Sequence, residues 1–259
     1  MKLKEIIKLI ESEYPIELAY EWDNSGLFYG HIEKDIKKVI VTLDITCDVV
    51  EQAIQNGAQL ILAHHPFVMS GIKTLADNSM HAKMIEMIIK NDIAVYSAHT
   101  NMDTAKNGIN QKLAELFGLT YIEVLEQDKP YIDCGLGRIG VLKEEMTLEA
   151  FSKLTAQLLK TPFVRVSGAK KTVKKIAIAS GSCSEYVPTA IKKGADVIIT
   201  ADMKYHHCIE FAYDGIVVID AGHFPTERVV QDMFYDLLKN SGLEIVKAHI
   251  SDVFKLITE

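Results

Sequence analysis

The sequence predicts an α/β fold of two related halves, in which mainly parallel sheets are flanked by helices. An internal repeat carries this prediction, because residues 37–63 align without gaps with residues 174–200. Each copy has an apolar strand, a helix with paired apolar positions that stops at a glycine, and a second apolar strand. A strand–helix–strand unit of this length joins parallel strands. We therefore expect an internal duplication of one α/β unit.

The first half is expected to begin with a surface helix. Between Leu3 and Ile10, apolar residues recur at helical spacing and charged residues interrupt the run, which argues against a signal peptide. Gly57 lies where a C-terminal helix cap is expected in the first copy of the repeat. The other expected elements are strands at 39–43, 59–63 and 93–98 and helices around 49–54 and 109–117.

A connecting stretch of different character precedes the second half. It is expected to contain one or two strands within 131–142, a helix over 147–160 that Thr147 caps, and a strand at 163–166. The second half then has expected strands at 176–179, 197–200 and 216–220 and helices around 186–191 and 229–238. We place the boundary just before Pro130, which gives an N-terminal half of residues 1–128 and a C-terminal half of residues 129–259.

Composition and charge restrict the class of protein. Of the 259 residues, 48% are hydrophobic and 24% are charged, which is typical of a globular protein. A net charge of -7 and a pI of about 5.7 argue against nucleic-acid binding, since phosphate contacts need a basic surface. The four scattered cysteines indicate a reducing compartment. No stretch approaches the roughly 18 apolar residues of a membrane span, so we expect a cytoplasmic protein without membrane contact.

His64 and His65 directly follow the expected strand at 59–63. In open parallel sheets, binding sites form at the carboxyl ends of the strands. Adjacent side chains leave an extended backbone in opposite directions, so the two histidines can reach two ions more easily than one. The pair therefore suggests a dinuclear metal centre.

Two further pairs follow strand ends at corresponding places in the two halves. In each pair a carboxylate follows a histidine by four residues: Asp103 follows His99, and Glu227 follows His223. The recurrence of this unit favours metal ligands over ordinary structural histidines. Three other histidines have no partner at ligand spacing and are expected to be structural: His31, His81 and His249.

We expect two divalent metal ions, zinc, iron or manganese, bound by five residues: His64, His65, Asp103, His223 and Glu227. If Glu227 bridges the ions, each has about three protein ligands and open positions for water. Water bound in this way becomes a nucleophile near neutral pH. His99 and Asp44 are candidates to orient the ligands. Asp44, Asp23 and Asn24 are weaker candidates to hold a substrate or to transfer a proton.

One motif is misleading. Gly135–Gly140 satisfies G-x-G-x-x-G, the dinucleotide-binding pattern, which requires a helix at its end and an acidic residue about 20 positions later. Here the next residues are typical of a strand, and Lys160 stands where an acidic residue is needed. We therefore give dinucleotide binding little weight. The sequence also contains no P-loop, no G-x-S-x-G and no Cys–His nucleophile pair.

The ordered motifs resemble those of one family, the GTP cyclohydrolase 1 type 2 homologues, also called Nif-three-like dinuclear metal proteins. The resemblance covers nearly the whole chain, and the motifs are specific in this order. They are Trp22–Leu27 (WDNSGL), Leu43–Thr46 (LDIT), Ala63–Pro66 (AHHP), His99–Asp103 (HTNMD), Gly137–Gly140 (GRIG), Thr200–His206 (TADMKYH) and Gly222–Glu227 (GHFPTE).

This resemblance implies a Nif-three-like fold and places the family's metal ligands on the same five residues. It further implies a homohexameric ring of dimers with the sites facing an internal cavity. The sequence departs from the family pattern in two ways. Ala201 stands where the family usually has glycine, and the chain lacks the large central insertion of longer members.

Two functions of different classes remain open. The first is a metal-dependent hydrolase in which metal-activated water attacks a small or nucleotide-like substrate. GTP ring opening follows only from the family name, and no segment shows a guanine or triphosphate pocket. The second is a non-catalytic metal-binding ring that binds a partner or buffers metal. A third function, threading of DNA through a ring, is disfavoured by the acidic charge.

Overall fold

The computed structural model describes residues 1–76 and 79–257, and the chain divides into two compact units. Unit 1 contains Met1–Met102 and the residues from Val229 onward, whereas unit 2 contains Asp103–Arg228. The chain thus leaves unit 1 after Met102 and returns to it at Val229. Unit 2 is an insertion into the chain of unit 1.

Unit 1 is built on a five-stranded sheet with the strand order β1-β4-β3-β2-β11. The strands are β1 (Gly26–Tyr29), β2 (Lys38–Thr42), β3 (Leu60–Ala63), β4 (Ala94–Ser97) and β11 (Glu244–Lys247). β4, β3, β2 and β11 pair in parallel with their neighbours, and β1 pairs antiparallel with β4. β3 and β4 are buried along their whole length, which explains their continuous apolar sequences.

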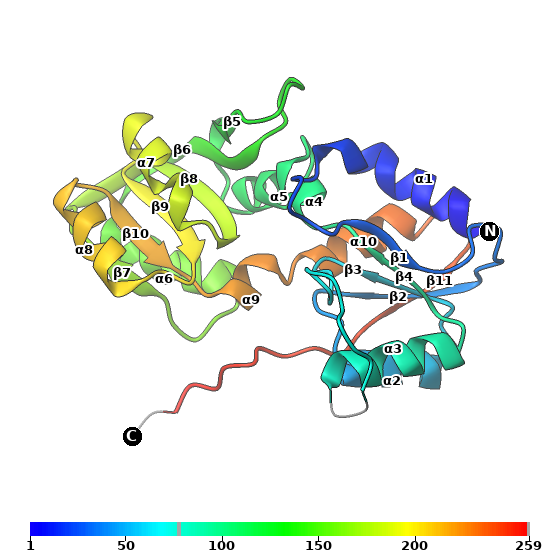
Figure 1. Cartoon of the computed structure of the whole chain (residues 1–259). Helices are drawn as coiled ribbons and strands as arrows, with labels where there is room; N and C mark the ends of the chain where they lie inside the picture. Colours follow the sequence, from blue (N-terminus) through cyan, green and yellow to red (C-terminus); the bar gives the residue numbers. More distant parts are fainter. Residues whose placement is uncertain (77–78, 258–259) are drawn as a thin grey trace. The chain divides into compact units, whose positions relative to one another are not determined.

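Helices cover both faces of this sheet (Figure 1). They are α1 (Leu3–Glu13), α2 (Cys47–Asn56), α3 (Met80–Lys90) and α10 (Val230–Leu238), and a 3-10 turn, η1 (Ile16–Leu18), follows α1. α2 and α3 lie on one face, and α1 and α10 lie on the other (Figure 1). The hydroxyl of Thr46 caps α2 by accepting from the amide of Val49. Buried residues of α2, α3 and the central strands form one apolar core.

Unit 2 is built on a six-stranded mixed sheet with the order β5-β6-β8-β9-β10-β7. The strands are β5 (Thr120–Glu126), β6 (Leu136–Thr147), β7 (Arg165–Ser167), β8 (Thr172–Ser182), β9 (Val197–Ala201) and β10 (Val217–Asp220). β8, β9 and β10 pair in parallel, whereas the other three neighbouring pairs are antiparallel. Antiparallel strands therefore flank the parallel part of the sheet on both sides.

The helices of unit 2 are short. They are α5 (Ile109–Leu116), α6 (Leu148–Leu158), α7 (Val187–Lys192), α8 (Tyr205–Tyr213) and α9 (His223–Glu227), with a 3-10 turn, η2 (Ser184–Tyr186), before α7. A further helix, α4 (Thr100–Thr104), spans the point where the chain enters the unit. The sequence predicts that Thr147 caps the helix after it, and this is confirmed, because its hydroxyl accepts from the amide of Ala150 at the start of α6.

Both copies of the sequence repeat form a parallel strand–helix–strand unit. β2 and β3 pair in parallel around α2, and β8 and β9 pair in parallel around α7. Gly57 and Gly194, which follow these helices, have φ angles of 65° and 72°, as the predicted C-terminal caps require. The α/β fold is confirmed, although the sheet of unit 2 is mixed rather than mainly parallel. A common origin of the two copies by duplication stays a prediction.

The predicted boundary between residues 128 and 129 does not coincide with the boundaries of the compact units. β5 precedes this position and β6 follows it, yet the two strands pair antiparallel in one sheet. A division there would cut the hydrogen bonds that join them. The chain passes between the units after Met102 and after Arg228 instead.

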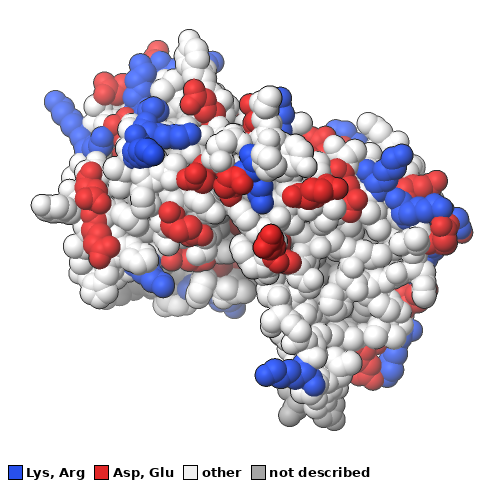
Figure 2. Space-filling model, turned by 45° about the horizontal axis from the view of Figure 1, so that its top comes forward, with Lys and Arg blue, Asp and Glu red and all other residues white. Residues whose placement is uncertain are grey.

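Charged side chains of both signs lie on the face of the molecule that Figure 2 shows. On the face that Figure 2 shows, lysine and arginine lie in separate groups among aspartate and glutamate. This agrees with the small net negative charge of the sequence. Among the helices that the structure describes, none is long and apolar enough to span a membrane.

Candidate metal centre

Three histidine side chains of unit 1 lie together where β3 and β4 end. His64 and His65 directly follow β3, and His99 lies two residues after β4. Since β3 and β4 are parallel neighbours, their carboxyl ends meet at one edge of the sheet. The ring centroids are 4.9 Å apart for His64 and His65, and 5.2 and 5.4 Å from that of His99. One ligand atom of each lies within 4.8 Å of the others, so the three could hold a metal ion.

The Nδ1 atoms of the first two histidines are fixed by different acceptors. Nδ1 of His64, which is fully buried, lies 2.8 Å from the carbonyl oxygen of Ala98. Nδ1 of His65 lies 2.7 Å from Oδ1 of Asp44. A proton on Nδ1 satisfies both acceptors, which leaves the lone pair of each imidazole on Nε2. This tautomer is the one that binds a metal through Nε2.

His99 is held by a buried carboxylate. Nδ1 of His99 lies 2.7 Å from Oδ1 of Asp23, whose side chain is fully buried. The other oxygen of Asp23 accepts from the hydroxyls of Ser25 and Thr100. Burial opposes ionisation of Asp23, but these hydrogen bonds and the charge of His99 outweigh it, so the pKa of Asp23 lies well below its ordinary value. Asp23 therefore stays ionised and fixes the orientation of the imidazole.

In unit 2, His223 and Glu227 lie one turn apart on α9. Nε2 of His223 is 2.9 Å from Oε2 of Glu227, and Nδ1 of His223 is 2.6 Å from Oδ2 of Asp202. When Nδ1 carries the proton toward Asp202, the Nε2 lone pair faces a carboxylate oxygen. Two acceptors at this distance need a proton or a cation between them. The pair therefore offers a nitrogen ligand, an oxygen ligand and a negative charge, which together suit a bound cation.

The backbone of β8 passes very close to the Glu227 carboxylate. Gly181, in β8, has a φ of 66°, and a Cβ at this position would lie 2.1 Å from Oε1 of Glu227 and 3.3 Å from Nε2 of His223. The amide of Gly181 also donates to the hydroxyl of Thr226, next to Glu227. Only glycine fits this approach, so the residue type at position 181 fixes where the carboxylate lies.

Asn110 links Asp103 to the same end of β8. Its amide nitrogen donates to the carbonyl oxygen of Asp103 at 3.1 Å, and its amide oxygen accepts from the backbone N–H of Ser180 at 2.8 Å. Asp103 is 9% exposed and Asn110 is 1% exposed. Because Ser180 precedes Gly181, one hydrogen-bonded path runs from Asp103 through β8 to α9. Unit 2 therefore holds Asp103, His223 and Glu227 on a connected frame.

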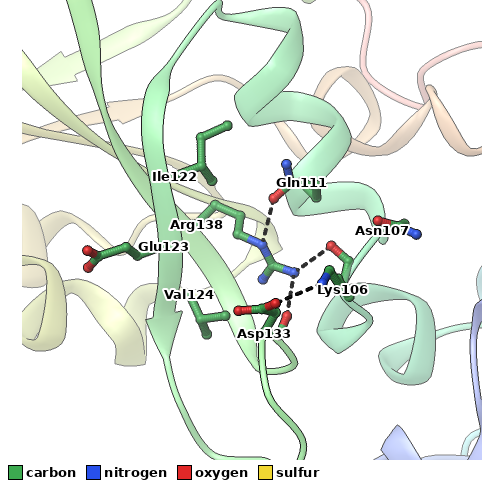
Figure 3. Close-up of a pocket in the computed structure, with 8 residues that line it drawn as sticks. All are labelled: Lys106, Asn107, Gln111, Ile122, Glu123, Val124, Asp133 and Arg138. Carbon is green, nitrogen blue, oxygen red and sulfur yellow. Dashed lines mark hydrogen bonds and ion pairs between the residues drawn. The ribbon is translucent and has the colours of Figure 1, made fainter.

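Arg138 anchors the segment that follows Asp103. The side chain is 2% exposed and extends from β6 toward the connection between α4 and α5 (Figure 3). Nε donates to Oε1 of Gln111, and the two Nη atoms donate to five carbonyl oxygens, those of Ala105, Lys106, Asp133, Gly135 and Gly137. These acceptors satisfy the hydrogen-bond donors of the buried guanidinium, so Arg138 serves the packing of the fold. The residue positions the chain next to the candidate ligand.

The glycine motif at 135–140 belongs to this packing. Its last five residues lie in β6, and β6 continues to Thr147, so no helix opens at its end. A Cβ on Gly137 would lie 2.9 Å from the carbonyl oxygen of Ile178 in β8. The glycines therefore permit close strand packing, which agrees with the expectation that the motif is not a dinucleotide site.

Cys183 contributes a protonated thiol near the carboxylates of unit 2. Burial raises its pKa well above the ordinary value, and the negative charges of Asp103, Glu185 and Glu227 raise it further. A thiol in this state is a poor nucleophile and a poor metal ligand. The donor set of the region is therefore imidazole nitrogen and carboxylate oxygen.

Comparison with known proteins gives the family. A family model for Duf34/NIF3 (NGG1p interacting factor 3) matches residues 1–254. The chain belongs to the Duf34/NIF3 family. Two curated relatives are each called GTP cyclohydrolase 1 type 2 homolog. One, from Clostridium perfringens, is 36% identical over 99% of this chain and 100% of its own length; the other, from Methanocaldococcus jannaschii, is 37% identical over 95% and 98%.

Two solved structures have the same fold. A Bacillus cereus protein related to NIF3 has a TM-score of 0.90 at 29% identity and covers 99% of both chains. Reduced HcgD from Methanocaldococcus jannaschii has a TM-score of 0.84 at 34% identity, covering 95% of this chain and 97% of that one. The resemblance seen in the sequence motifs is thus confirmed, and so is the fold that it implies.

In this NIF3-family chain the predicted site residues fall into two groups. His64 and His65 belong to the histidine group of unit 1, and Asp103, His223 and Glu227 belong to unit 2. His99, which the sequence leaves as a candidate to orient ligands, lies within the histidine group. Asp44 contacts His65, as expected of an orienting residue.

Sequence reasoning did not single out the residues that support the unit 2 group. These are Asp202, Asn110, Thr226 and Gly181. Asp202 could have been found, because it follows a strand end, as the candidate ligands do. The role of Gly181 depends on close approach of a helix distant in sequence, which no local pattern reveals.

Proposed function

We propose that this chain binds two divalent metal ions through His64, His65, Asp103, His223 and Glu227 and acts as a metal-dependent hydrolase. Zinc, iron and manganese suit this set of nitrogen and oxygen donors. The substrate is a small or nucleotide-like molecule, which agrees with the name GTP cyclohydrolase 1 type 2 homolog that the two relatives carry.

The orientation of the histidines is the observation that supports this proposal most. Each Nδ1 faces a fixed acceptor: the Ala98 carbonyl for His64, Asp44 for His65, Asp23 for His99 and Asp202 for His223. Histidines that bind metals through Nε2 commonly donate Nδ1–H to a carboxylate or carbonyl in this way. A single buried histidine also needs a hydrogen-bond partner, but the same orientation at four candidate histidines favours metal ligands over separate structural roles.

The two groups would contribute different properties to the centre. The imidazoles of unit 1 are neutral ligands, whereas Asp103 and Glu227 supply negative charge that offsets the charge of the ions. When bound, the ions supply the Lewis acidity that makes water a nucleophile near neutral pH. The protein residues hold the ligand atoms, and the buried carboxylate of Glu227 is the candidate to bridge the ions.

Elemental analysis of untagged, gently purified protein tests the metal part of the proposal. We expect about two metal atoms per chain, and a sharp fall in His65→Ala with the fold retained by circular dichroism. His31→Ala is the matched control, since His31 is exposed and lies outside the candidate groups. A metal content near zero that added zinc, manganese or iron does not raise would refute the proposal.

A substrate screen tests the hydrolase part. Metal-loaded protein is assayed with nucleotides, phosphoesters and cyclic amides, beside a Glu227→Gln variant of matched concentration. Turnover that the variant loses supports hydrolysis. Full metal occupancy without turnover above the variant favours the other function, a non-catalytic protein that binds a partner or buffers metal.

The oligomeric state stays a prediction. Resemblance to the family implies a homohexameric ring, and light scattering after size-exclusion chromatography gives the mass that tests it. A monomer at working concentration would remove the ring from the proposal without affecting the metal ligands.

A further inference from the structure

An exposed aromatic pair lies beside the histidines of unit 1. Trp22, the only tryptophan in the sequence, is 62% exposed. The ring of Tyr20 stacks on it with centroids 5.7 Å apart and planes inclined by 12°. The ring of His99 is nearly perpendicular to the indole, at an interplanar angle of 81° and with centroids 6.2 Å apart. Tyr20 therefore supports one side of the indole beside His99, and most of the Trp22 surface faces solvent.

The turn that carries Trp22 is anchored on both sides. The amide of Tyr20 donates to the Thr100 hydroxyl at 3.0 Å, and the amide of Asp23 donates to the carbonyl of Tyr20 at 3.0 Å. The side chain of Asn24 donates to the carbonyl of Val68, in the segment after His65. Because the indole is exposed, it does not contribute the stabilisation that its burial would give. Because the turn is anchored, the backbone that carries the indole is also held in place. This arrangement is typical of a ring that is held ready to contact a ligand.

The aromatic pair continues into the histidine group. The ring of His99 lies 5.2 Å from that of His64 and 5.4 Å from that of His65, so Trp22 is separated from both by one ring. A planar group bound on the indole would hold the atoms attached to it close to these histidines. Flat heteroaromatic rings, such as nucleobases, stack on tryptophan through their π-faces, whereas a phosphate group has no such face.

We propose that Trp22, supported by Tyr20, stacks on a planar heteroaromatic ring of the substrate and so determines its class. The inference rests on the proposed function, because that function places the reaction at the candidate metal centre. Stacking of a ring on Trp22 can nevertheless occur without catalysis. Because every nucleobase has a π-face, this contact selects a ring over an aliphatic group without selecting one base.

Two probes that differ only in the base test this inference. Adenosine 5′-monophosphate carries a heteroaromatic ring, and ribose 5-phosphate is the same molecule without it. Binding of each to metal-loaded protein is measured by calorimetry, and fluorescence quenching reports directly on Trp22 because the chain has no other tryptophan. We expect the nucleotide to bind more tightly and to quench the emission, and ribose 5-phosphate to leave the emission unchanged.

Variants separate stacking from a structural role. Trp22→Ala should weaken nucleotide binding by roughly tenfold or more, whereas Trp22→Phe, which keeps a ring, should retain most of the affinity. Tyr213→Ala is the control, because Tyr213 is a 92% exposed aromatic residue on α8 and should not affect binding.

The inference is overturned if Trp22→Ala binds the nucleotide as tightly as the wild type, or if both probes bind the wild type equally. Metal content is measured in the same samples. Wild-type protein with full metal that does not distinguish the probes contradicts only the stacking inference. Wild-type protein without metal contradicts the proposed function, and the nucleotide comparison then stands as a separate result.

Discussion

The two candidate ligand groups are built in different ways. The histidines of unit 1 follow two adjacent parallel strands, and each is oriented through its own Nδ1 acceptor. In unit 2, carboxylates dominate, and a path of backbone and side-chain contacts through Asn110, Ser180, Gly181 and Thr226 fixes them. The first group is set by sheet topology and side-chain partners. The second depends on a close approach between a helix and a strand.

This difference predicts where each group is sensitive to substitution. The unit 1 group should tolerate changes in the backbone nearby but respond to loss of an Nδ1 acceptor. The unit 2 group should respond to any added atom between β8 and α9. Five experiments test this contrast, from the largest expected effect to the smallest.

The largest effect is expected for Gly181→Ala. The added Cβ would lie 2.1 Å from Oε1 of Glu227, so the carboxylate must move, and the φ of 66° strains any other residue. We expect loss of bound metal, measured by elemental analysis, and a lower melting temperature. Gly194→Ala is the matched control, since Gly194 has a φ of 72° and no atom within 4 Å of an added Cβ. It should cost about 1 kcal/mol and leave metal content unchanged. Equal metal loss in both variants would show that the close approach does not matter.

Asn110→Leu should have the next largest effect. It removes both hydrogen bonds that connect Asp103 to β8 and leaves a buried carbonyl and a buried amide to find other partners. We expect a loss of about 1–3 kcal/mol in the free energy of unfolding, measured with denaturant, and weaker metal binding. Lys112→Leu, at an exposed position of the same helix, is the matched control. If Asn110→Leu keeps the wild-type metal affinity, Asn110 does not help to position the metal ligands.

In unit 1, Asp44→Asn should weaken metal binding more than Asp23→Asn. Asp44 orients His65, one of the five proposed ligands, whereas Asp23 orients His99, which is not among them. Loss of a carboxylate that orients a metal-binding histidine typically lowers metal affinity 10–100-fold, so about that range is expected for Asp44→Asn and a smaller loss for Asp23→Asn. Competition with a chromogenic chelator measures both. The reverse order would mean that His99 is itself a metal ligand.

Stability against pH gives an independent reading of Asp23 in metal-free protein. Its pKa is lowered in the folded state, so the ionised carboxylate stabilises the fold above the unfolded-state pKa of about 4. That contribution is lost as the pH falls through the folded-state pKa. The difference in unfolding free energy between wild type and Asp23→Asn should thus shrink as the pH falls below about 4. A difference that grows as the pH falls below about 4 would contradict the assignment.

The smallest effect concerns thiol labelling. Cys183 is buried with a raised pKa, whereas Cys47 is partly exposed. Iodoacetamide at pH 8 should modify Cys47 and spare Cys183, as measured by mass spectrometry of peptides. Rapid modification of Cys183 in folded protein would show that the carboxylate region is open or less negative than described.

The sequence predicts the elements that depend on local pattern. The apolar runs of β2, β3, β8 and β9, and the glycines after α2 and α7, identify both parallel strand–helix–strand units. It does not predict β11, because a four-residue strand with exposed ends carries little pattern and pairs with β2, far away in the chain. α3, α8, β1 and β5 are also not assigned from the sequence. Strand ends locate the candidate ligands, but their Nδ1 acceptors and the approach of Gly181 arise only from tertiary packing.

The order of the chain has a consequence for synthesis on the ribosome. β11 supplies the strand beside β2, and it is made only after the whole of unit 2, so the edge of the unit 1 sheet stays unpaired while Asp103–Arg228 emerge. An unpaired edge of this kind can recruit other strands. Unit 2 is continuous in the chain and can fold during translation, whereas unit 1 must wait for its final segment. Nascent chains that stop before Glu244 should therefore be the ones most prone to aggregate.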